Sequence, residues 1–304
     1  MKLKRMLTIF LSIIFVLNST FLVTNTTSIN VINHTNVVIS NTVQSDDLEF
    51  YALIVGVEKF SGVEFPEEDK IDDGAIAMYN LLVNSSNWKE DNIKILLNEN
   101  GSKDKIQDAI VNWLGEKEDK NDIVLIFYAS HGWKIPITKR KYGHAMVYTY
   151  NMTKEFRIED AITDKEFDSW VDTLDSKNIV IILETCYSGK MFALRQKGRV
   201  LLTAGGKHFF CGVDEDDTLG CGIFGHFLLQ GFIGVADLNN DGWVTAEEAF
   251  HYARLPTIHF SIWKQFPFII EWNNKTIIWF FQIPWMYDRH IGSIPLVQYK
   301  IDET

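Results

Sequence analysis

The chain has 304 residues, of which 46% are hydrophobic, and a formal net charge of −11 at pH 7. This length allows one large domain or two ordinary ones, and the apolar content is enough for a globular core. An acidic chain without a clustered basic stripe does not have the surface of a nucleic-acid-binding protein. We therefore expect no nucleic-acid partner.

Residues 1–23 have the pattern of an export signal, in which Lys2, Lys4 and Arg5 precede an apolar run at 6–17. That run is shorter than the roughly 20 apolar residues that span a bilayer. We expect a signal peptide or, if it is retained, an N-terminal anchor as the chain's sole membrane contact. The protein is then secreted or extracytoplasmic. Residues 24–47, rich in Asn, Thr and Ser, are expected to form a polar linker.

Apolar strands and amphipathic helices alternate along residues 48–256. Strands are expected at 50–57, 93–97, 122–128, 179–183 and 199–203, and helices after 72–73, at 103–114, from 163–164, at 224–232 and at 245–253. This alternation predicts an α/β domain with a mostly parallel sheet covered on both faces. The aromatic-rich extension 257–304 is expected to pack on that domain as terminal strands.

Two of the predicted strands end in residues that can carry chemistry. The strand at 122–128 leads to His131 and Gly132, and the strand at 179–183 leads to Cys186. The carboxyl ends of neighbouring parallel strands meet at one sheet edge, where open α/β sheets place their ligands. A thiol beside an imidazole suits nucleophilic acyl transfer, with peptide hydrolysis as its commonest form. The alternative is that the cysteine is inert packing at a strand end.

The sequences around these residues resemble a known family. F-Y-A-S-H-G (127–132) and L-E-T-C-Y-S-G-K-M-F (183–192) resemble the two blocks of the legumain family of cysteine peptidases, and the runs 222–232 and 235–248 are similar to its prokaryotic caspase-like members. The resemblance covers about residues 51–253. It implies a caspase-like three-layer α/β/α sandwich with a mostly parallel central sheet.

The same resemblance implies roles for individual residues. Cys186 is the expected nucleophile and His131 the general base and acid, while the backbone N–H groups of Gly132 and Cys186 form the oxyanion hole. Glu184 falls where the family lines its specificity pocket; the alternative is that it only caps the end of the strand. The family's third, orienting residue has no match, so we expect a Cys–His dyad that needs no cofactor for catalysis.

Acidic residues gather where relatives carry a pocket arginine. The loop around Asp69 holds three consecutive carboxylates, and residues 214–217 are acidic as well. Glu184 and Asp69 are therefore predicted to bind substrate, with a preference for Arg or Lys before the scissile bond. The alternative is that these loops are solvated surface.

Residues 237–248 fit the calcium-loop pattern D-x-N-x-D-G-x5-E. The predicted ligands of a structural Ca²⁺ are the side chains of Asp237, Asn239, Asp241 and Glu248 and the backbone carbonyl of Trp243. Turns rich in Asp and Asn also form without a metal, which is the alternative.

The chain has three cysteines, and in an oxidising compartment an odd count leaves one thiol over. Cys211 and Cys221 could form a disulfide and leave Cys186 as the free thiol, or all three cysteines could be reduced. We expect a cysteine endopeptidase acting on proteins or peptides. The alternatives are a transamidase or ligase of the same fold and a catalytically silent, calcium-stabilised binding module at the cell surface.

Overall fold

A computed structural model describes residues 48–63, 71–135, 144–206, 221–264 and 282–298. The expected signal and linker (1–47), Asp69, Cys211 and the acidic run 214–217 lie outside these residues. No helix in the described part of the chain is long and apolar enough to cross a membrane.

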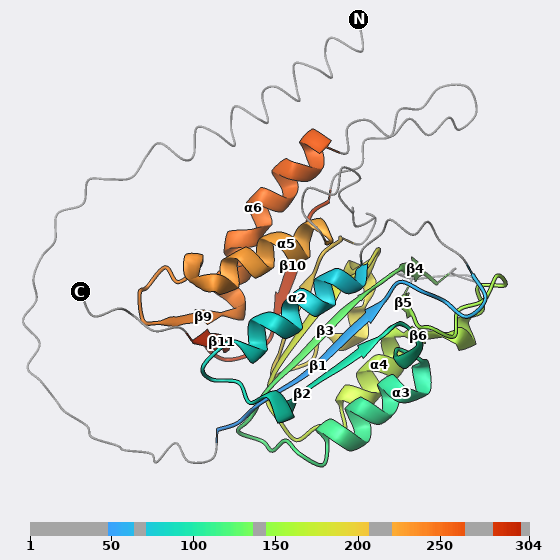
Figure 1. Ribbon diagram of the computed structural model, residues 1–304, viewed down its shortest axis with the longest axis horizontal. Coiled ribbons are helices and arrows are strands. Elements are labelled where there is room, and N and C mark those ends of the chain that lie inside the picture. The colour runs from blue at the N-terminus through green and yellow to red at the C-terminus, as the bar shows by residue number, and fades with distance from the viewer. Residues whose placement is uncertain (1–47, 64–70, 136–143, 207–220, 265–281, 299–304) are drawn as a thin grey trace, which may run out of the picture. The chain divides into compact units, whose positions relative to one another are not determined.

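A six-stranded sheet lies at the centre of the fold (Figure 1), in the order β10-β8-β7-β3-β1-β2. Five strands are parallel, and β10 at one edge is antiparallel to its neighbour β8. The strands are β1 (Phe50–Val57), β2 (Ile93–Leu97), β3 (Ile123–Ser130), β7 (Asn178–Glu184), β8 (Arg199–Thr203) and β10 (Trp285–Asp288). The predicted mostly parallel sheet is thus confirmed.

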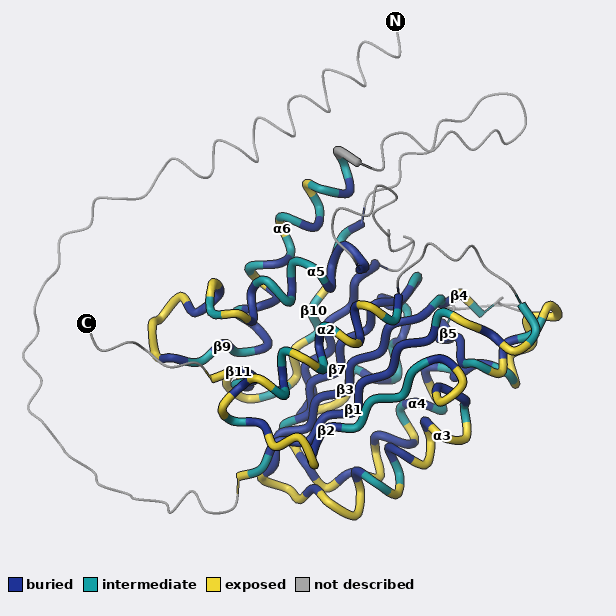
Figure 2. Tube along the Cα trace, viewed as in Figure 1, coloured by how far each residue is buried: buried dark blue, intermediate teal, exposed yellow. Residues whose placement is uncertain are grey.

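Helices cover both faces of this sheet, which explains why the inner strands are continuously apolar between their ends. One face carries α2 (Ile71–Val83), α5 (Ile223–Gln230) and α6 (Ala246–Lys264), and the other carries α3 (Lys103–Asp108), a π-helical turn (Ala109–Leu114) and α4 (Asp164–Val171). Successive residues of β1 alternate between the two cores: Ile54 belongs to the first and Leu53 to the second. Both strands β1 and β3 are buried along their whole length (Figure 2).

Two small antiparallel sheets complete the fold. One follows His131 directly and consists of β4 (Gly132–Lys134), β5 (Ala145–Tyr148) and β6 (Ala161–Thr163). The other pairs β9 (Trp243–Thr245) with β11 (Pro295–Gln298). Short 3₁₀ segments lie at Glu90–Asn92, Asn98–Asn100, Ile158–Asp160, Ser188–Lys190 and Phe192–Leu194, and a π-helical turn at Gly231–Val235 follows α5.

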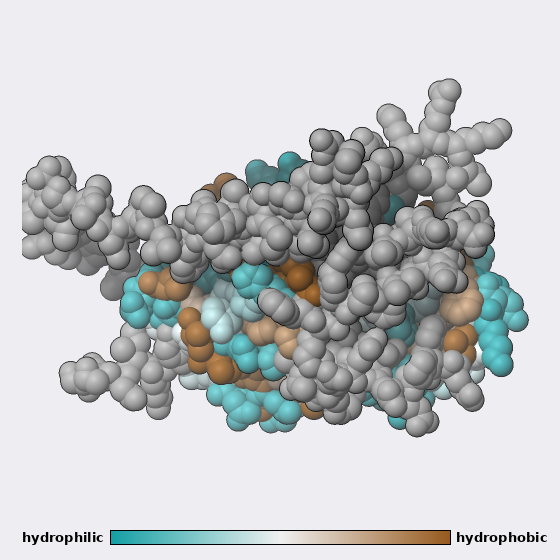
Figure 3. All heavy atoms as spheres, turned by 90° about the horizontal axis from the view of Figure 1, so that it is seen from above, coloured by the Kyte–Doolittle hydropathy of each residue, from teal (hydrophilic) through white to brown (hydrophobic). Residues whose placement is uncertain are grey.

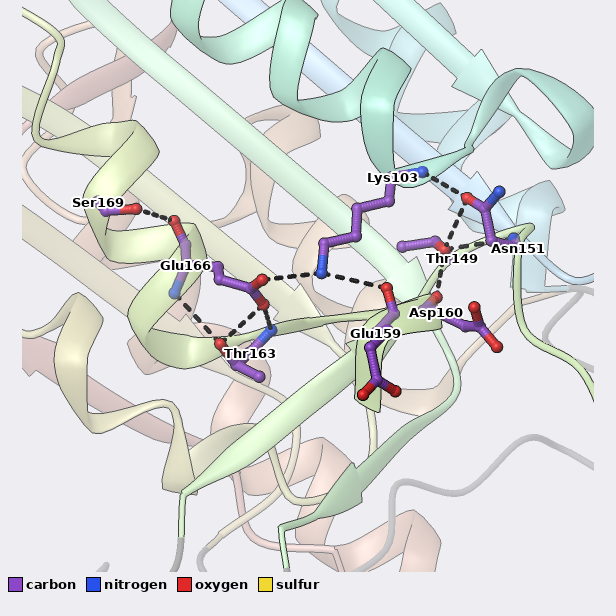
Figure 4. A network of polar contacts seen from close by, with 8 residues as sticks. All are labelled: Lys103, Thr149, Asn151, Glu159, Asp160, Thr163, Glu166 and Ser169. Atoms are coloured by element: carbon purple, nitrogen blue, oxygen red, sulfur yellow. Dashed lines mark hydrogen bonds and ion pairs between the residues drawn. The ribbon is translucent and has the colours of Figure 1, made fainter. Parts of the chain in front are cut away.

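A polar network braces the β5–β6 pair against α3 and α4 (Figure 4). The Lys103 ammonium lies 2.8 Å from a carboxylate oxygen of Glu166 and 3.3 Å from the backbone carbonyl of Glu159. Glu166 also completes a capping box with Thr163 at the start of α4. The Thr149 hydroxyl donates to the carbonyl of Asp160 at 2.7 Å. These bonds fix β5, the strand that packs beside His131.

The C-terminal part is built into the domain. The boundary expected after residue 256 falls inside α6, which contains Pro256 and continues to Lys264. Beyond it, β10 pairs with β8 of the central sheet and β11 pairs with β9. The indole N–H of Trp88 donates to the carbonyl of Leu296 at 2.7 Å in a buried position. The described residues 282–298 therefore belong to the same core.

Candidate active site

His131 and Cys186 lie at equivalent points beyond neighbouring strands. In the parallel register of β3 and β7, Ile123 pairs with Asn178, and the pairing continues without a shift to Ala129 and Glu184. His131 and Cys186 each follow two residues after that last pair. The structure therefore brings both to the same point of the same sheet edge, as the sequence predicts.

Gly132 packs directly on the backbone of the cysteine segment. A Cβ atom at this position would come within 2.7 Å of the Cys186 carbonyl oxygen and 3.2 Å of the Met146 carbonyl oxygen. Real side chains do not approach backbone so closely, so the contact requires glycine. The backbone of Gly132 is thereby held beside that of Cys186, and its role as an oxyanion donor stays a prediction.

Aromatic residues enclose the His131 ring. Its centroid lies 5.9 Å from that of Phe60 and 6.4 Å from that of Tyr148. The Tyr148 backbone N–H donates to the His131 carbonyl at 2.9 Å, and the buried Tyr128 hydroxyl donates to the Tyr148 carbonyl at the same distance. The strand β5 thus holds both the backbone and the ring of the histidine.

Cys186 is partly exposed, and its sulfur interacts electrostatically with the phenol groups of Tyr148 and Tyr187. Burial, and then the charge of the Cys186 sulfur, raise the pKa of Tyr148 and of Tyr187 above the ordinary value. Tyr187 has a left-handed backbone with φ of 56°, which turns the chain sharply after the cysteine.

The turn after Cys186 is anchored to the ends of β8 and β10. The Gly189 N–H donates to the Gly205 carbonyl at 2.9 Å. The Arg195 guanidinium donates to the Gly189 carbonyl at 2.7 Å, and its central carbon lies 3.3 Å from the ring centroid of Tyr287 in β10. The edge strand therefore stabilises the segment that carries the thiol.

Glu184 is 9% exposed, and its carboxyl group faces the N-terminus of α5. A Cβ atom at Gly222 would lie 2.5 Å from one of its oxygens. Burial raises the pKa of Glu184 to about 8; the N–H groups of Gly225 and Phe224 lower it in part, although no hydrogen bond of normal geometry forms. This position suits a structural role beneath α5, and contact with substrate stays a prediction.

Glu58, Asp72 and Asn98 form a polar cluster where β1 ends, and none of them was among the candidate site residues predicted from the sequence. Val57 pairs with Ser130, so Glu58 lies level with His131 on the next strand. Burial, followed by a hydrogen bond with Asp72, raises the pKa of Glu58 to about 7. Asn98 donates to Asp72 at 2.7 Å and accepts the N–H of Glu58 at 3.1 Å. The signal available in the sequence was a glutamate directly after a buried strand.

The predicted calcium loop is closed by hydrogen bonds of its own. Asp237 accepts the N–H of Gly242 at 3.1 Å, and Asp241 accepts the N–H of Trp243 at 2.9 Å. The Glu248 carboxylate accepts the N–H and the hydroxyl of Thr245 at 3.0 and 2.9 Å, which caps α6. Within the described residues no three His, Cys, Asp or Glu side chains are arranged to hold a metal. Calcium binding stays a prediction.

Two further features have no assigned role. Cys221 is a buried thiol, and burial followed by the charge of Glu184 raises its pKa to about 12. A cavity of about 700 Å³ lies between α2, the end of α5 and β11, and is lined by residues such as Leu81, Phe232 and Val297. Apolar and hydrophilic side chains are interspersed over the described surface in Figure 3.

Comparisons with known proteins agree with this fold. A family model described as the caspase domain matches residues 49–247. Among solved structures, protein GSU0716 from Geobacter sulfurreducens is similar, with a TM-score of 0.52 and 12% sequence identity over 83% of this chain and 97% of that one. At this identity the likeness concerns the fold alone. A search of curated proteins found no significant match.

Proposed function

Since the chain belongs to the caspase domain family, we propose that it is a cysteine endopeptidase in which Cys186 and His131 form the catalytic dyad. The legumain type within that family rests on the sequence blocks around these two residues. The proposed substrates are proteins or peptides outside the cytoplasm, a proposal that rests on the export signal predicted from the sequence of residues 1–23.

One observation carries this proposal. The unbroken register of β3 and β7 puts an imidazole and a thiol level with each other at the carboxyl edge of a parallel sheet. Packing alone does not require the two residue types at equivalent positions beyond neighbouring strands, followed in one case by a glycine against the cysteine backbone. A nucleophile and its base must come within hydrogen-bond reach of each other, and neighbouring positions at one sheet edge allow this.

The proposed reaction proceeds through a thioacyl-enzyme. The His131 imidazole takes the thiol proton, and the Cys186 sulfur attacks the scissile carbonyl carbon. The oxyanion accepts hydrogen bonds from the backbone N–H groups of Gly132 and Cys186. As the C–N bond breaks, the imidazolium gives its proton to the leaving amine. Water, activated by the same imidazole, then hydrolyses the thioester and restores the thiol.

An electrophilic peptide probe tests the proposed nucleophile. We expect covalent modification of Cys186, its loss in Cys186→Ala and a strong decrease in His131→Ala, because the imidazole generates the thiolate. Cys221→Ala is the matched control and should label like the wild type, since its thiol is buried. A protein that is folded but not modified at Cys186 would be a binding module. Products formed with an added amine distinguish hydrolysis from transamidation.

A further inference from the structure

Asp164, the first residue of α4, buries its carboxyl group inside the domain. Its side chain is only 1% exposed. Thr163 and Glu166 already cap this helix through a capping box, so α4 does not need a further acid at its start. Burial of a carboxylate is unfavourable unless the group is hydrogen-bonded. The partners of Asp164 therefore indicate what this residue contributes.

One carboxylate oxygen of Asp164, Oδ2, binds two segments that are distant in the sequence. The ring nitrogen Nδ1 of His144 lies 2.7 Å from it, and the Ala193 backbone N–H donates to it at 3.2 Å. An ionised carboxylate only accepts hydrogen bonds, so His144 is the donor in its pair. The other oxygen, Oδ1, makes no hydrogen bond with the residues that the structure describes. Among these residues, the carboxyl group therefore serves His144 and Ala193.

His144 belongs to the hairpin that follows the proposed base. The Ile135 N–H donates to the His144 carbonyl at 2.9 Å, which extends the ladder between β4 and β5. That ladder starts directly after His131. The His144 side chain is 42% exposed, so one part of its ring meets solvent while Nδ1 faces Asp164. The bond between these two side chains therefore ties the hairpin after His131 to the start of α4.

Ala193 belongs to the turn that follows the proposed nucleophile. It lies in the 3₁₀ segment Phe192–Leu194. Earlier in this turn, the Gly189 N–H donates to the carbonyl of Gly205, which follows β8. The end of β8 thus anchors the turn near its start, and Asp164 anchors it near its end.

Resting on the proposed peptidase activity, we propose that Asp164 is a positioning residue of the active site. Through one oxygen it joins the hairpin after His131 to the turn after Cys186, and so keeps the imidazole and the thiol at the separation that proton transfer requires. It acts through His144 and Ala193 and takes no part in bond making. Because a displacement of about 1 Å can slow catalysis about a hundredfold, loss of this connection should lower turnover.

Turnover and thiol reactivity test this role separately from substrate binding. The kcat and KM are measured with a fluorogenic peptide that the wild type cleaves. The rate of Cys186 alkylation by iodoacetamide, which needs no peptide site, is followed by mass spectrometry. At a temperature at which each variant is folded, Asp164→Ala should lower kcat and the alkylation rate about tenfold to a hundredfold, with KM nearly unchanged. His144→Leu should lower both about tenfold, because the bond to Ala193 remains.

Conservative variants show whether the hydrogen bonds carry the effect. Asp164→Asn keeps an acceptor oxygen at the position of Oδ2, and His144→Asn keeps an N–H donor near the position of Nδ1. Both should recover most of the kcat that is lost in Asp164→Ala and His144→Leu. Glu166→Gln is the control, because it weakens the cap of the same helix and leaves both bonds of Asp164 in place. It should lower the melting temperature and keep kcat.

Unchanged kcat and alkylation in folded Asp164→Ala, or an equal loss in Glu166→Gln, would overturn the positioning role. If Asp164→Ala does not fold, the comparison of His144→Leu with His144→Asn decides, and equal kcat in these two variants would overturn the role as well. A wild type that cleaves no peptide and is not labelled at Cys186 by the electrophilic peptide probe would instead reject the peptidase proposal and, with it, a role of Asp164 in catalysis.

Discussion

Glu184 carries a carboxyl group that is buried two residues before Cys186, so its protonation is linked to folding. The pKa rises from 4.5 to about 8 on folding, mainly because burial disfavours the charged form. The folded state therefore holds the proton more tightly than the unfolded state. The stability that this carboxyl group contributes is complete below about pH 4.5 and is lost as the pH rises toward 8.

The variant Glu184→Gln should make stability less dependent on pH. Between pH 5 and 8, ionisation of this carboxyl group lowers the free energy of unfolding of the wild type by at most about 1.4 kcal/mol per pH unit. The glutamine side chain of the variant does not ionise, so this loss disappears. Denaturant unfolding over this range measures the difference in slope. Glu159→Gln, at an exposed glutamate, is the control. Parallel stability curves for Glu184→Gln and the wild type would show that the carboxyl group is not perturbed.

Gly132→Ala should affect activity more than folding. The added Cβ atom would lie 2.7 Å from the Cys186 carbonyl oxygen, so the cysteine segment must shift away from its position beside His131. We expect a loss of about 1–3 kcal/mol in the free energy of unfolding and little labelling of Cys186 by the probe. At Gly292, where an added Cβ meets nothing within 4 Å, alanine should leave labelling intact. Normal labelling of Gly132→Ala would exclude this close approach.

Some site residues could be identified from the sequence and others could not, for a physical reason. His131 and Cys186 stand out because each ends a continuous apolar strand, and parallel strands end together. The position of Lys134 over the Tyr187 ring could not be predicted in this way, because only the short β4–β5 ladder and the left-handed turn at Tyr187 bring the two side chains together. Side-chain meetings of this kind depend on tertiary structure.

At the scale of elements, Glu248 in the loop 237–248 caps a helix and is also predicted to bind calcium, and an experiment can separate the two roles. Glu248 is both the last predicted calcium ligand and the residue that completes the cap of α6 with Thr245. Glu166 completes a similar cap at α4, far from any calcium motif. The two glutamates therefore form a matched pair.

If the loop binds calcium, tenfold excess of Ca²⁺ over Kd should raise the melting temperature by about 3–6 °C, and chelator should reverse the effect. Glu248→Gln should lower stability and abolish this response. Glu166→Gln should lower stability but keep the response, because only its cap and its ion pair with Lys103 are weakened. A melting temperature that calcium does not change in the wild type would remove the metal from this loop.

Strands with a continuous apolar pattern were predicted closely, whereas the helix expected at 245–253 extends to Lys264. The bounds of β1, β2 and β8 agree with the sequence expectation. The strands β4, β5 and β6 have three or four residues each, too few for a periodic pattern, and they form through pairing with one another. The helix α2 begins at Ile71, so Asp72 and Asp73 occupy its first turn and do not precede it.

At the scale of the whole molecule, the C-terminal strands decide where the domain ends. The alternation of strands and helices predicts the parallel sheet, but it does not predict that a distant segment adds an antiparallel edge. Through β10, residues near the C-terminus reach the turn after Cys186, where Tyr287 packs against Arg195. Through β11, they bury Leu296 in the core shared with α2 and α6.

A chain that ends after Lys264 should therefore fail to fold cooperatively. It would expose the edge of β8, remove the β11 partner of β9 and leave the buried Trp88 indole N–H without its acceptor at Leu296. A chain that ends after Gln298 keeps these contacts and is the control, expected to melt like the full-length protein. Solubility, thermal unfolding and labelling of Cys186 measure the difference. Because an exposed, unpaired strand edge favours aggregation, we expect the shorter chain to aggregate. A soluble shorter chain with a single sharp melt would instead support the domain boundary expected near residue 256.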